Sequence, residues 1–346
     1  MDTAFPIHER PRPILEAASL KKYFPIHGGV FNRKIAEVRA VDDVSFAVAE
    51  GETLGVVGES GCGKSTVARL LMHLVPLNGG SIAFDGNPVG GPGGLPLRAL
   101  RRVMQIVFQD SDSSLNPRLP IQESIAYGPH AHGMTKAAAR DLARELLQRV
   151  GLRPDLFSAR YPHELSGGQK QRINIARALA LDPRVLILDE AVSALDKSVE
   201  AQVLNLLKDL KQQFNLTYVF ISHDLNVVQH VSDRVLVMYL GRVVEIGPVE
   251  AIYQRPKHPY TEALLRSRLT PDPLNRTDTP PIGGDPPNPI DPPSGCGFRT
   301  RCPFAEEVCA ARTPRLRARA DDDAHFAACH INDPASGHSR RQGVGR

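Results

Sequence analysis

The strongest constraint on this chain is a glycine-rich stretch, Gly58-Glu59-Ser60-Gly61-Cys62-Gly63-Lys64-Ser65, that follows a short apolar run and opens a helix-forming segment at Thr66. It fits the pattern G-x-x-x-x-G-K-[S/T] in the strand–loop–helix context that this pattern requires. Its three glycines let backbone N–H groups turn inward around phosphates, and the following helix adds the positive end of its dipole. The lysine would reach the β- and γ-phosphates, and the final serine would ligate Mg²⁺. The sequence therefore predicts a binding site for a nucleoside triphosphate.

Length and charge narrow the class of protein. The chain has 346 residues, enough for two domains or for one large domain with an appendage. Its 42 basic and 38 acidic side chains nearly balance, which argues against a broad nucleic-acid surface. No stretch reaches the roughly 18 apolar residues of a membrane-spanning helix, and the first residues lack the apolar core of a signal peptide. We therefore expect a cytosolic chain that binds no nucleic acid and meets a membrane only through a partner.

The order of apolar runs predicts an α/β fold. Alternating strands and helices around a phosphate loop indicate a mostly parallel sheet with flanking helices. Ala and Leu at helical spacing mark an α-helical insert within 121–160, in which one helix ends at Gly151. We expect strands at 14–24, 38–48, 81–86, 103–108, 185–190, 217–222, 235–239 and 242–246.

A second group of candidate site residues follows the apolar run Val185-Leu186-Ile187-Leu188. A buried parallel strand reads as such a run, and ligands bind at the carboxyl ends of the strands in open α/β sheets. Asp189 would then complete the Mg²⁺ coordination, and Glu190 would polarise an attacking water. The alternative is that these two carboxylates only cap the next helix.

The stretch Leu165-Ser166-Gly167-Gly168-Gln169 offers a hydroxyl and free N–H groups at the start of a helix, which makes a second anion site. One γ-phosphate does not need two such loops from one chain, so this loop would serve a nucleotide held by another subunit. With these motifs in order, the chain resembles the ATP-binding subunit of an ABC transporter over residues 14–260. The resemblance implies an ABC-type nucleotide-binding domain with an antiparallel β subdomain and a helical subdomain.

The same resemblance implies further site residues. Asp196 belongs to a stretch that looks like the D-loop, and His223 looks like the switch histidine that contacts the γ-phosphate. Phe24 or Tyr23 would stack on adenine, with the spacing favouring Phe24. Gln109 would sense Mg²⁺ and contact the membrane subunits. The expected catalytic residues are Glu190, His223 and Gln109, and the expected Mg²⁺ ligands are Ser65, Gln109 and Asp189.

A closer resemblance is to ATP-binding subunits of bacterial dipeptide and oligopeptide importers. It implies ATP hydrolysis that energises peptide import, carried out at the cytoplasmic face of the cell membrane by a peripheral subunit. The implied partners are a second ATPase subunit, two permeases and, indirectly, an extracytoplasmic peptide-binding protein. Importers of nickel or glutathione share these features and are alternatives. The resemblance rests on Gln105–Asp110, Ser113–Arg118, Asp189–Asp196, His258–Thr261, Gly295–Phe298, Arg301–Pro303 and His325–Phe326.

Four of the five cysteines lie in the C-terminal segment, namely Cys296, Cys302, Cys309 and Cys329. In a reducing cytosol such clustering favours metal or cofactor ligation over disulfides. Four thiolates suit a [4Fe–4S] cluster or a tetrahedral Zn²⁺ site, and unligated cysteines are the third alternative. The resemblance to subunits with a C-terminal Fe–S cluster favours iron, in a structural role.

These patterns divide the chain into four parts. An ABC ATP-binding domain is expected over 14–262, with its helical subdomain at about 110–175, and a Pro-rich linker with the cysteine segment over 263–331. Residues 1–13 and 332–346 are expected to be poorly ordered. Two rival functions are a soluble ABC ATPase of DNA repair or translation and a regulatory ATPase whose cysteines sense redox state. The first rival commonly carries two cassettes or a long coiled coil, neither of which is legible here.

Overall fold

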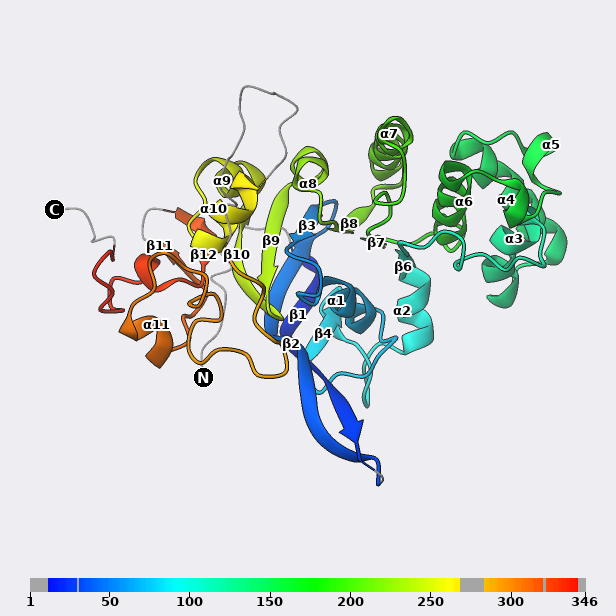
Figure 1. Cartoon of the computed structure of the whole chain (residues 1–346). Coiled ribbons are helices and arrows are strands. Elements are labelled where there is room, and N and C mark those ends of the chain that lie inside the picture. Colours follow the sequence, from blue (N-terminus) through cyan, green and yellow to red (C-terminus); the bar gives the residue numbers. More distant parts are fainter. Residues whose placement is uncertain (1–11, 30, 268–282, 320–321, 342–346) are drawn as a thin grey trace. The chain divides into compact units, whose positions relative to one another are not determined.

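The computed structural model of the chain describes residues 12–29, 31–267, 283–319 and 322–341 (Figure 1). The fold divides into two compact units that interleave along the sequence. Residues 1–11 of the expected flexible N-terminus and residues 268–282 of the expected linker lie outside the described residues. Of the described residues, the first unit takes those within Met1–Leu15, Ala47–Thr53 and Ala83–Ile221, and the second takes those within Glu16–Phe46, Leu54–Ile82 and Ser222–Arg346.

The first unit is built on three parallel strands, β6 (Met104–Val107), β7 (Val185–Asp189) and β8 (Thr217–Ile221). In register, β7 pairs with β6 on one side and with β8 on the other, so the carboxyl ends of the strands lie at one edge. Every residue of β7 and β8 is buried, which is why both strands read as continuous apolar runs rather than alternating ones. Asp189 is the last residue of β7 and therefore stands at that edge.

Helices make up most of the rest of the first unit. Of these, α3, α4 and α6 pack against one another, and α3 and α4 lie within the predicted helical insert (Figure 1). Thr135 caps the start of α4, and Gly151, with φ +75°, donates to Gln148 O just past its end, so this helix ends where the sequence predicts. The helices are α2 (Leu97–Val103), α3 (Ile121–Ala131), α4 (Lys136–Arg149), α5 (Pro154–Phe157), the 3₁₀ turn η1 (Pro162–Glu164), α6 (Gly167–Leu179) and α7 (Lys197–Phe214).

The second unit holds the glycine-rich loop between β3 (Thr53–Val57) and α1 (Lys64–Leu71). Strand β3 pairs parallel with β9 (Arg234–Tyr239), and β9 pairs antiparallel with β10 (Arg242–Pro248). A separate sheet contains β1 (Pro13–Gly28), β2 (Arg33–Ala49) and β4 (Gly79–Phe84), with the short β5 (Asn87–Pro88) at its end. The remaining helices here are α8 (Leu225–Val231), α9 (Val249–Gln254), α10 (Pro259–Arg266) and α11 (Glu307–Ala311).

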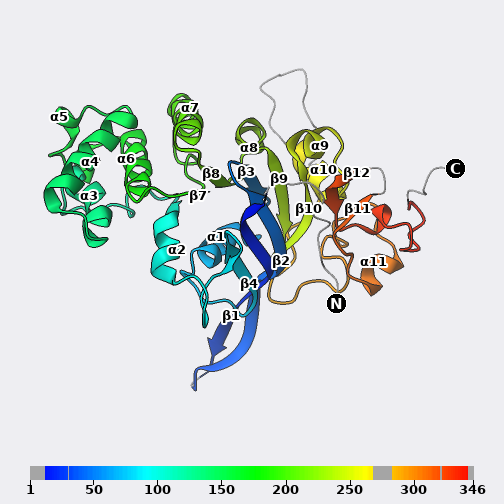
Figure 2. The same cartoon turned by 180° about the vertical axis from the view of Figure 1, so that it is seen from behind.

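The C-terminal segment is more regular than its sequence indicates. Strand β12 (Asp322–Ala327) pairs antiparallel with β10, and β11 (Arg317–Arg319) pairs with β12, so the segment extends the same sheet (Figure 2). Residues after the 3₁₀ turn η2 (His330–Asn332) are also packed, because Ser336 and His338 are buried. The strands depart from the expected irregular extension, and residues 332–341, the described part of the expected poorly ordered tail, include these buried side chains. These elements cannot be predicted from an apolar pattern, because the segment is rich in charged residues and its strands are stabilised by pairing and packing.

No helix within the described ranges is long and apolar enough to cross a membrane.

Candidate nucleotide-binding site

Glycines shape the loop between β3 and α1. Gly58 has a φ of +151°, and a Cβ there would lie 2.2 Å from the carbonyl oxygen of Met238. Gly63 has a φ of +108°, and a Cβ there would lie 2.2 Å from the carbonyl oxygen of Ala40. Only glycine fits positions that combine such backbone angles with such close contacts. The path of the loop is therefore set by the neighbouring main chain on two sides.

The lysine of the loop is buried within it. The side chain of Lys64 is 4% exposed, and its Nζ donates to Gly58 O at 2.7 Å and to Glu59 O at 3.0 Å. Helix α1 begins at Lys64, two residues earlier than expected, so Ser65 and Thr66 lie in its first turn. The ammonium is thus enclosed by the loop at the N-terminal end of a helix, which is where anions bind.

Cys62 is the buried thiol of this loop. Burial raises its pKa, so the thiol is neutral at pH 7 despite the nearby Lys64. Its carbonyl oxygen accepts a hydrogen bond of 2.9 Å from Gly241 N. Cys62 therefore adds a packing contact and a backbone anchor to the loop, and no charge.

Three contacts to this loop come from residues that the sequence analysis did not assign to the nucleotide site. Tyr260 Oη accepts a hydrogen bond of 2.9 Å from Glu59 N. The guanidinium of Arg301 binds the Glu59 carboxylate through two hydrogen bonds, of 2.9 and 3.0 Å. The third contact is the bond from Gly241 to Cys62. These partners lie about two hundred residues along the chain from the loop, so no local spacing signals them.

The two candidates for adenine stacking differ in their surroundings. Tyr23 Oη donates to Asp42 Oδ1 at 2.6 Å, and Asp42 also pairs with Arg242 at 2.6 Å. Burial and this hydrogen bond raise the pKa of Tyr23 to about 12. Phe24 is 37% exposed, with Lys22 Nζ 5.1 Å from its ring centroid. The Tyr23 phenol is hydrogen-bonded to Asp42, whereas the Phe24 ring is exposed, which favours Phe24 for stacking on adenine.

His223 lies on a short turn that is fixed at both ends. Asp224 N donates to Ser222 Oγ at 3.0 Å, and the Asp224 carboxylate caps α8 by accepting from Asn226 N at 2.9 Å and Val227 N at 3.4 Å. The His223 side chain is exposed. The turn therefore presents the imidazole outward from a rigid backbone.

In the first unit, the two candidate carboxylates lie at the carboxyl end of β7, Asp189 as its last residue and Glu190 directly after it. Asp189 is 4% exposed, and Glu190 follows it with a φ of +50°. Glu190 N donates to Ile221 O at 3.0 Å, while Glu190 O accepts from Ser193 N and Oγ at 3.2 and 3.0 Å. A non-glycine residue in the left-handed region is strained and persists where its surroundings hold it, which is common at functional sites.

The alternative that these carboxylates cap the next helix is wrong. Helix α7 begins at Lys197, and its N-cap is Asp196. Asp189 and Glu190 therefore precede that helix by a whole connecting turn.

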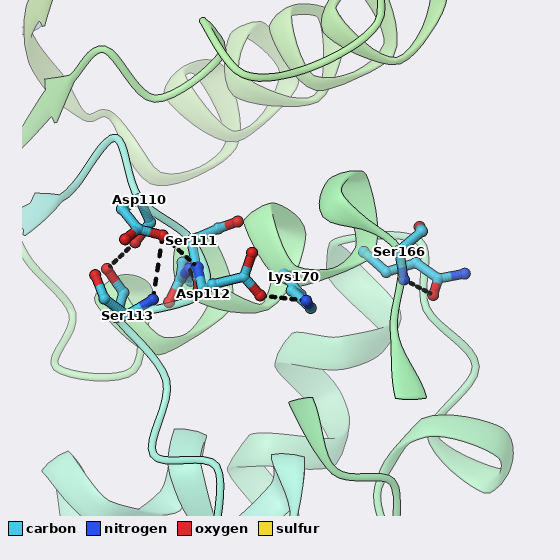
Figure 3. Close-up of polar contacts among 9 residues, drawn as sticks. Asp110, Ser111, Asp112, Ser113, Ser166 and Lys170 are labelled. Atoms are coloured by element: carbon cyan, nitrogen blue, oxygen red, sulfur yellow. Dashed lines mark hydrogen bonds and ion pairs between the residues drawn. The ribbon is translucent and has the colours of Figure 1, made fainter. Parts of the chain in front are cut away.

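The Ser166 loop begins helix α6. Ser166 is the N-cap, and its N–H donates to Gln169 Oε1 at 3.1 Å (Figure 3). A Cβ on Gly168 would lie 2.4 Å from Cγ1 of Val199 on α7, whereas a Cβ on Gly167 would meet nothing closer than 3.8 Å. Gly168 is thus required for the close approach of α6 and α7. Ser166 and Gly167, at the start of α6, are exposed.

Helix α6 also holds the turn that follows the exposed Gln109. Asp110 Oδ1 accepts from Asp112 N at 2.9 Å and from Ser113 N at 3.2 Å, which closes the turn (Figure 3). Asp112 in turn pairs with Lys170, one turn into α6.

Two further side chains on the same face of α6 bind this turn. Asn174 Nδ2 donates to Ser111 O at 3.3 Å, and Arg177 donates to Ser114 O. The positions 170, 174 and 177 lie on one face of a helix. The helix that starts at the Ser166 loop and the turn after Gln109 are therefore held together.

The donors expected for Mg²⁺ are a hydroxyl, a side-chain amide and a carboxylate, on Ser65, Gln109 and Asp189. All three supply oxygen, which is what this hard cation requires, and the buried Asp189 carboxylate would supply the charge. The chemistry of the donor set fits magnesium.

The C-terminal cysteines do not form the expected iron–sulfur site. Among the described residues, no group of three or more His, Cys, Asp or Glu side chains could hold a metal ion. The four thiols line a small cavity with Phe298 and Phe304, and burial raises the pKa of Cys296 to about 11 and of Cys329 to about 12. The expectation of a [4Fe–4S] cluster is therefore wrong, and the zinc alternative loses its support.

Comparison with known proteins identifies the family. The family described as ABC transporter matches residues 41–193, and the oligopeptide/dipeptide transporter C-terminal region matches residues 244–309. The chain is 50% identical to the probable peptide ABC transporter ATP-binding protein y4tS of Sinorhizobium fredii, over 93% of this chain and 91% of that protein. It is 49% identical to the oligopeptide transport ATP-binding protein AppF of Bacillus subtilis, over 92% and 97%. Neither description names an iron–sulfur protein.

Solved structures show the same fold. The chain matches cbiO1 from Clostridium perfringens, part of the ABC transporter complex cbiONQ, with a TM-score of 0.60 and 26% identity over 70% of this chain and 92% of that one. It matches the ATP-binding cassette MJ0796, bound to ADP and phosphate in a post-hydrolysis dimer, with a TM-score of 0.58 and 26% identity over 68% and 98%. The predicted ABC-type fold is confirmed, and the chain belongs to the ATP-binding proteins of ABC peptide transporters.

Proposed function

We propose that this chain hydrolyses ATP to energise the import of di- or oligopeptides. The observation that carries the proposal is the joint presence of a complete phosphate loop and the oligopeptide/dipeptide transporter C-terminal region in one chain. The geometry of the loop supports it, because glycine-only backbone positions surround a buried lysine at a helix N-terminus. The descriptions of y4tS and AppF support the peptide cargo.

Within this proposal, the loop residues Gly58 to Thr66 bind the phosphates, and Phe24 stacks on adenine. Ser65, Gln109 and Asp189 would hold Mg²⁺, which would supply positive charge against the β- and γ-phosphates. Lys64 neutralises the same oxygens from within the loop. These groups position and stabilise charge, which is the main part of phosphoryl-transfer catalysis.

Glu190 and His223 act on the reacting end of the nucleotide. The carboxylate of Glu190 orients a water for attack and takes up its proton, from a backbone held in the left-handed region. His223 contacts the γ-phosphate from the turn that precedes α8. Both roles need rigid placement, and the backbone bonds around each residue support that placement.

The Ser166 loop serves a second subunit in this proposal. Ser166, Gly167, Gly168 and Gln169, together with Asp196, contact the nucleotide that a partner ATPase holds. Closing of the two subunits on ATP and their opening after hydrolysis drive two permeases, which receive peptide from an extracytoplasmic binding protein. The chain works as a peripheral subunit on the cytoplasmic side of the membrane.

The test is peptide uptake and ATP hydrolysis by the chain reconstituted with its permeases and partner ATPase in vesicles. Uptake should require ATP and should be lost when Lys64→Ala replaces the wild-type chain. Lys208→Ala, an exposed lysine on α7, is the matched control and should transport normally. Uptake of nickel or glutathione in place of peptides would contradict the proposed peptide cargo. ATP hydrolysis unaffected by Lys64→Ala would overturn the site.

A further inference from the structure

Glu59, the second residue of the phosphate loop, is bound by the C-terminal segment. Arg301 Nη1 and Nη2 bind Glu59 Oε2 and Oε1 at 2.9 and 3.0 Å, which is the paired, two-bond geometry of arginine with a carboxylate. The side chains are 6% and 23% exposed, respectively. Arg301 Nε also donates to Gly283 O at 3.1 Å, so all three guanidinium nitrogens are used. The contact between Arg301 and Glu59 joins residues that are 242 positions apart in the sequence.

The backbone of Glu59 is held as well. Its N–H donates to Tyr260 Oη at 2.9 Å, and Tyr260 is fully buried. The Tyr260 ring packs on Tyr239 and Phe298, with centroids 4.6 and 5.4 Å away. Phe298 belongs to the same segment as Arg301. The segment therefore supports Glu59 directly through Arg301 and indirectly through the aromatic rings beneath Tyr260.

A carboxylate in this loop has an electrostatic cost. The loop must accept a polyphosphate, and an unpaired carboxylate within it repels that anion, the more so where neighbouring groups exclude water. Glu59 also matters to the lysine, because its carbonyl oxygen is one of the two that hold Lys64 Nζ. The Arg301 guanidinium neutralises the carboxylate and fixes its direction, and both effects favour phosphate binding.

We propose that Arg301 is a positioning residue of the nucleotide site, through which the docked C-terminal segment sets the charge and conformation of the phosphate loop. Tyr260 supports the same residue from the backbone side. The inference rests on the proposed ATP binding and gives the C-terminal region a role in it. Because coupling between sites is reciprocal, nucleotide binding must stabilise the docked segment by the same factor by which the docked segment favours nucleotide.

The experiment uses the full chain and a fluorescent ATP analogue. Arg301→Gln should weaken binding about tenfold, which corresponds to about 1.4 kcal/mol. The double variant Glu59→Gln/Arg301→Gln should recover most of this loss, since the uncompensated carboxylate is gone. Arg299→Gln is the control and should bind as the wild type does, because it removes a neighbouring arginine whose guanidinium bonds to Ser294 of its own segment. In hydrolysis, Arg301→Gln should raise KM and leave kcat within about twofold.

Three outcomes overturn the proposal: wild-type affinity in Arg301→Gln, no recovery in the double variant, or an equal loss in Arg299→Gln. If Arg301→Gln fails to fold, Glu59→Gln alone decides, because it should bind the analogue at least as tightly as the wild type. Hydrogen exchange gives an independent readout. Nucleotide should slow exchange in residues 296–304 of the wild type, and unchanged exchange there overturns the coupling. A wild-type chain that binds no nucleotide instead refutes the proposed function itself.

Discussion

Glu245 on β10 accepts a hydrogen bond of 2.6 Å from Nε2 of His325 on β12, and both side chains are buried. The same carboxylate accepts the N–H of Lys257 at 2.6 Å and of His258 at 3.0 Å. Lys257 Nζ closes the arrangement by donating to His325 O at 3.0 Å. One buried carboxylate thus joins the sheet, the start of α10 and the C-terminal strand.

Removing the imidazole should destabilise this unit strongly. His325→Phe leaves the buried Glu245 carboxylate without its side-chain partner, and breaking such a pair costs about 3–5 kcal/mol. His325→Gln keeps an N–H donor and should cost less than half as much. Urea denaturation at pH 7.5 gives both free energies of unfolding. Equal losses in the two variants would show that the hydrogen bond does not hold the strand.

Glu190→Gln should separate binding from turnover. The amide cannot take up the proton of the attacking water, so kcat should fall about 100-fold or more, while nucleotide affinity stays near that of the wild type. The control is Glu145→Gln, an exposed carboxylate on α4, which should hydrolyse ATP normally. Steady-state hydrolysis and analogue binding measure the two effects. Undiminished turnover would remove Glu190 from its proposed role.

Gly168→Ala should disturb the junction of α6 and α7. The added Cβ would lie 2.4 Å from Val199 Cγ1, and overpacking of this kind costs about 1–3 kcal/mol. Gly167→Ala is the control, because its Cβ has 3.8 Å to the nearest atom. The double variant Gly168→Ala/Val199→Ala should regain most of the stability. Thermal unfolding measures all three, and no regain in the double variant would place the strain elsewhere.

His258 should make the protein sensitive to mild acid. Burial lowers its pKa to about 4, against the opposing effect of Glu245, while the unfolded chain titrates near its ordinary value of about 6.5. Between these values the unfolded state takes up a proton that the folded state refuses, so stability is complete above pH 6.5 and is lost as pH falls towards 4. The loss from this group is at most about 3 kcal/mol.

The matched variant for that prediction is His258→Asn. Asparagine can still accept the N–H of Tyr260, as His258 Nδ1 does at 3.0 Å, but it does not titrate. The free energy of unfolding should therefore depend less on pH in the variant than in the wild type between pH 6.5 and 4. Parallel pH profiles would contradict the assignment.

Local sequence patterns were sufficient to predict the elements whose structure depends on neighbouring residues. The apolar run before Asp189 predicted β7, because a strand buried on both faces is apolar at every position. The helical spacing up to Gly151 predicted α4 and its end. The loop pattern predicted where the lysine and the glycines lie, since the conformation of this loop requires these residues at these spacings.

Other features followed no local rule. The strand β12 is charged at its start and is held by pairing with β10, so its sequence resembles a loop. The four C-terminal cysteines cluster in the sequence, and in the structure they line one small cavity with two phenylalanines, Cys309 and Cys329 buried and Cys296 and Cys302 half-buried. Spacing alone cannot distinguish that packing from ligation, because both place thiols close together.

By itself, then, the sequence determined the family, the positions of the central strands along the chain and the glycine-rich loop with its lysine, since each depends on neighbours along the chain. Only the tertiary structure decided what surrounds them. Arg301 and Tyr260 contact Glu59 although they lie more than two hundred residues away in the sequence. Position 168 requires glycine because Val199, on another helix, leaves no room for a Cβ. Such contacts depend on how distant segments pack, and packing leaves no period or spacing in the sequence.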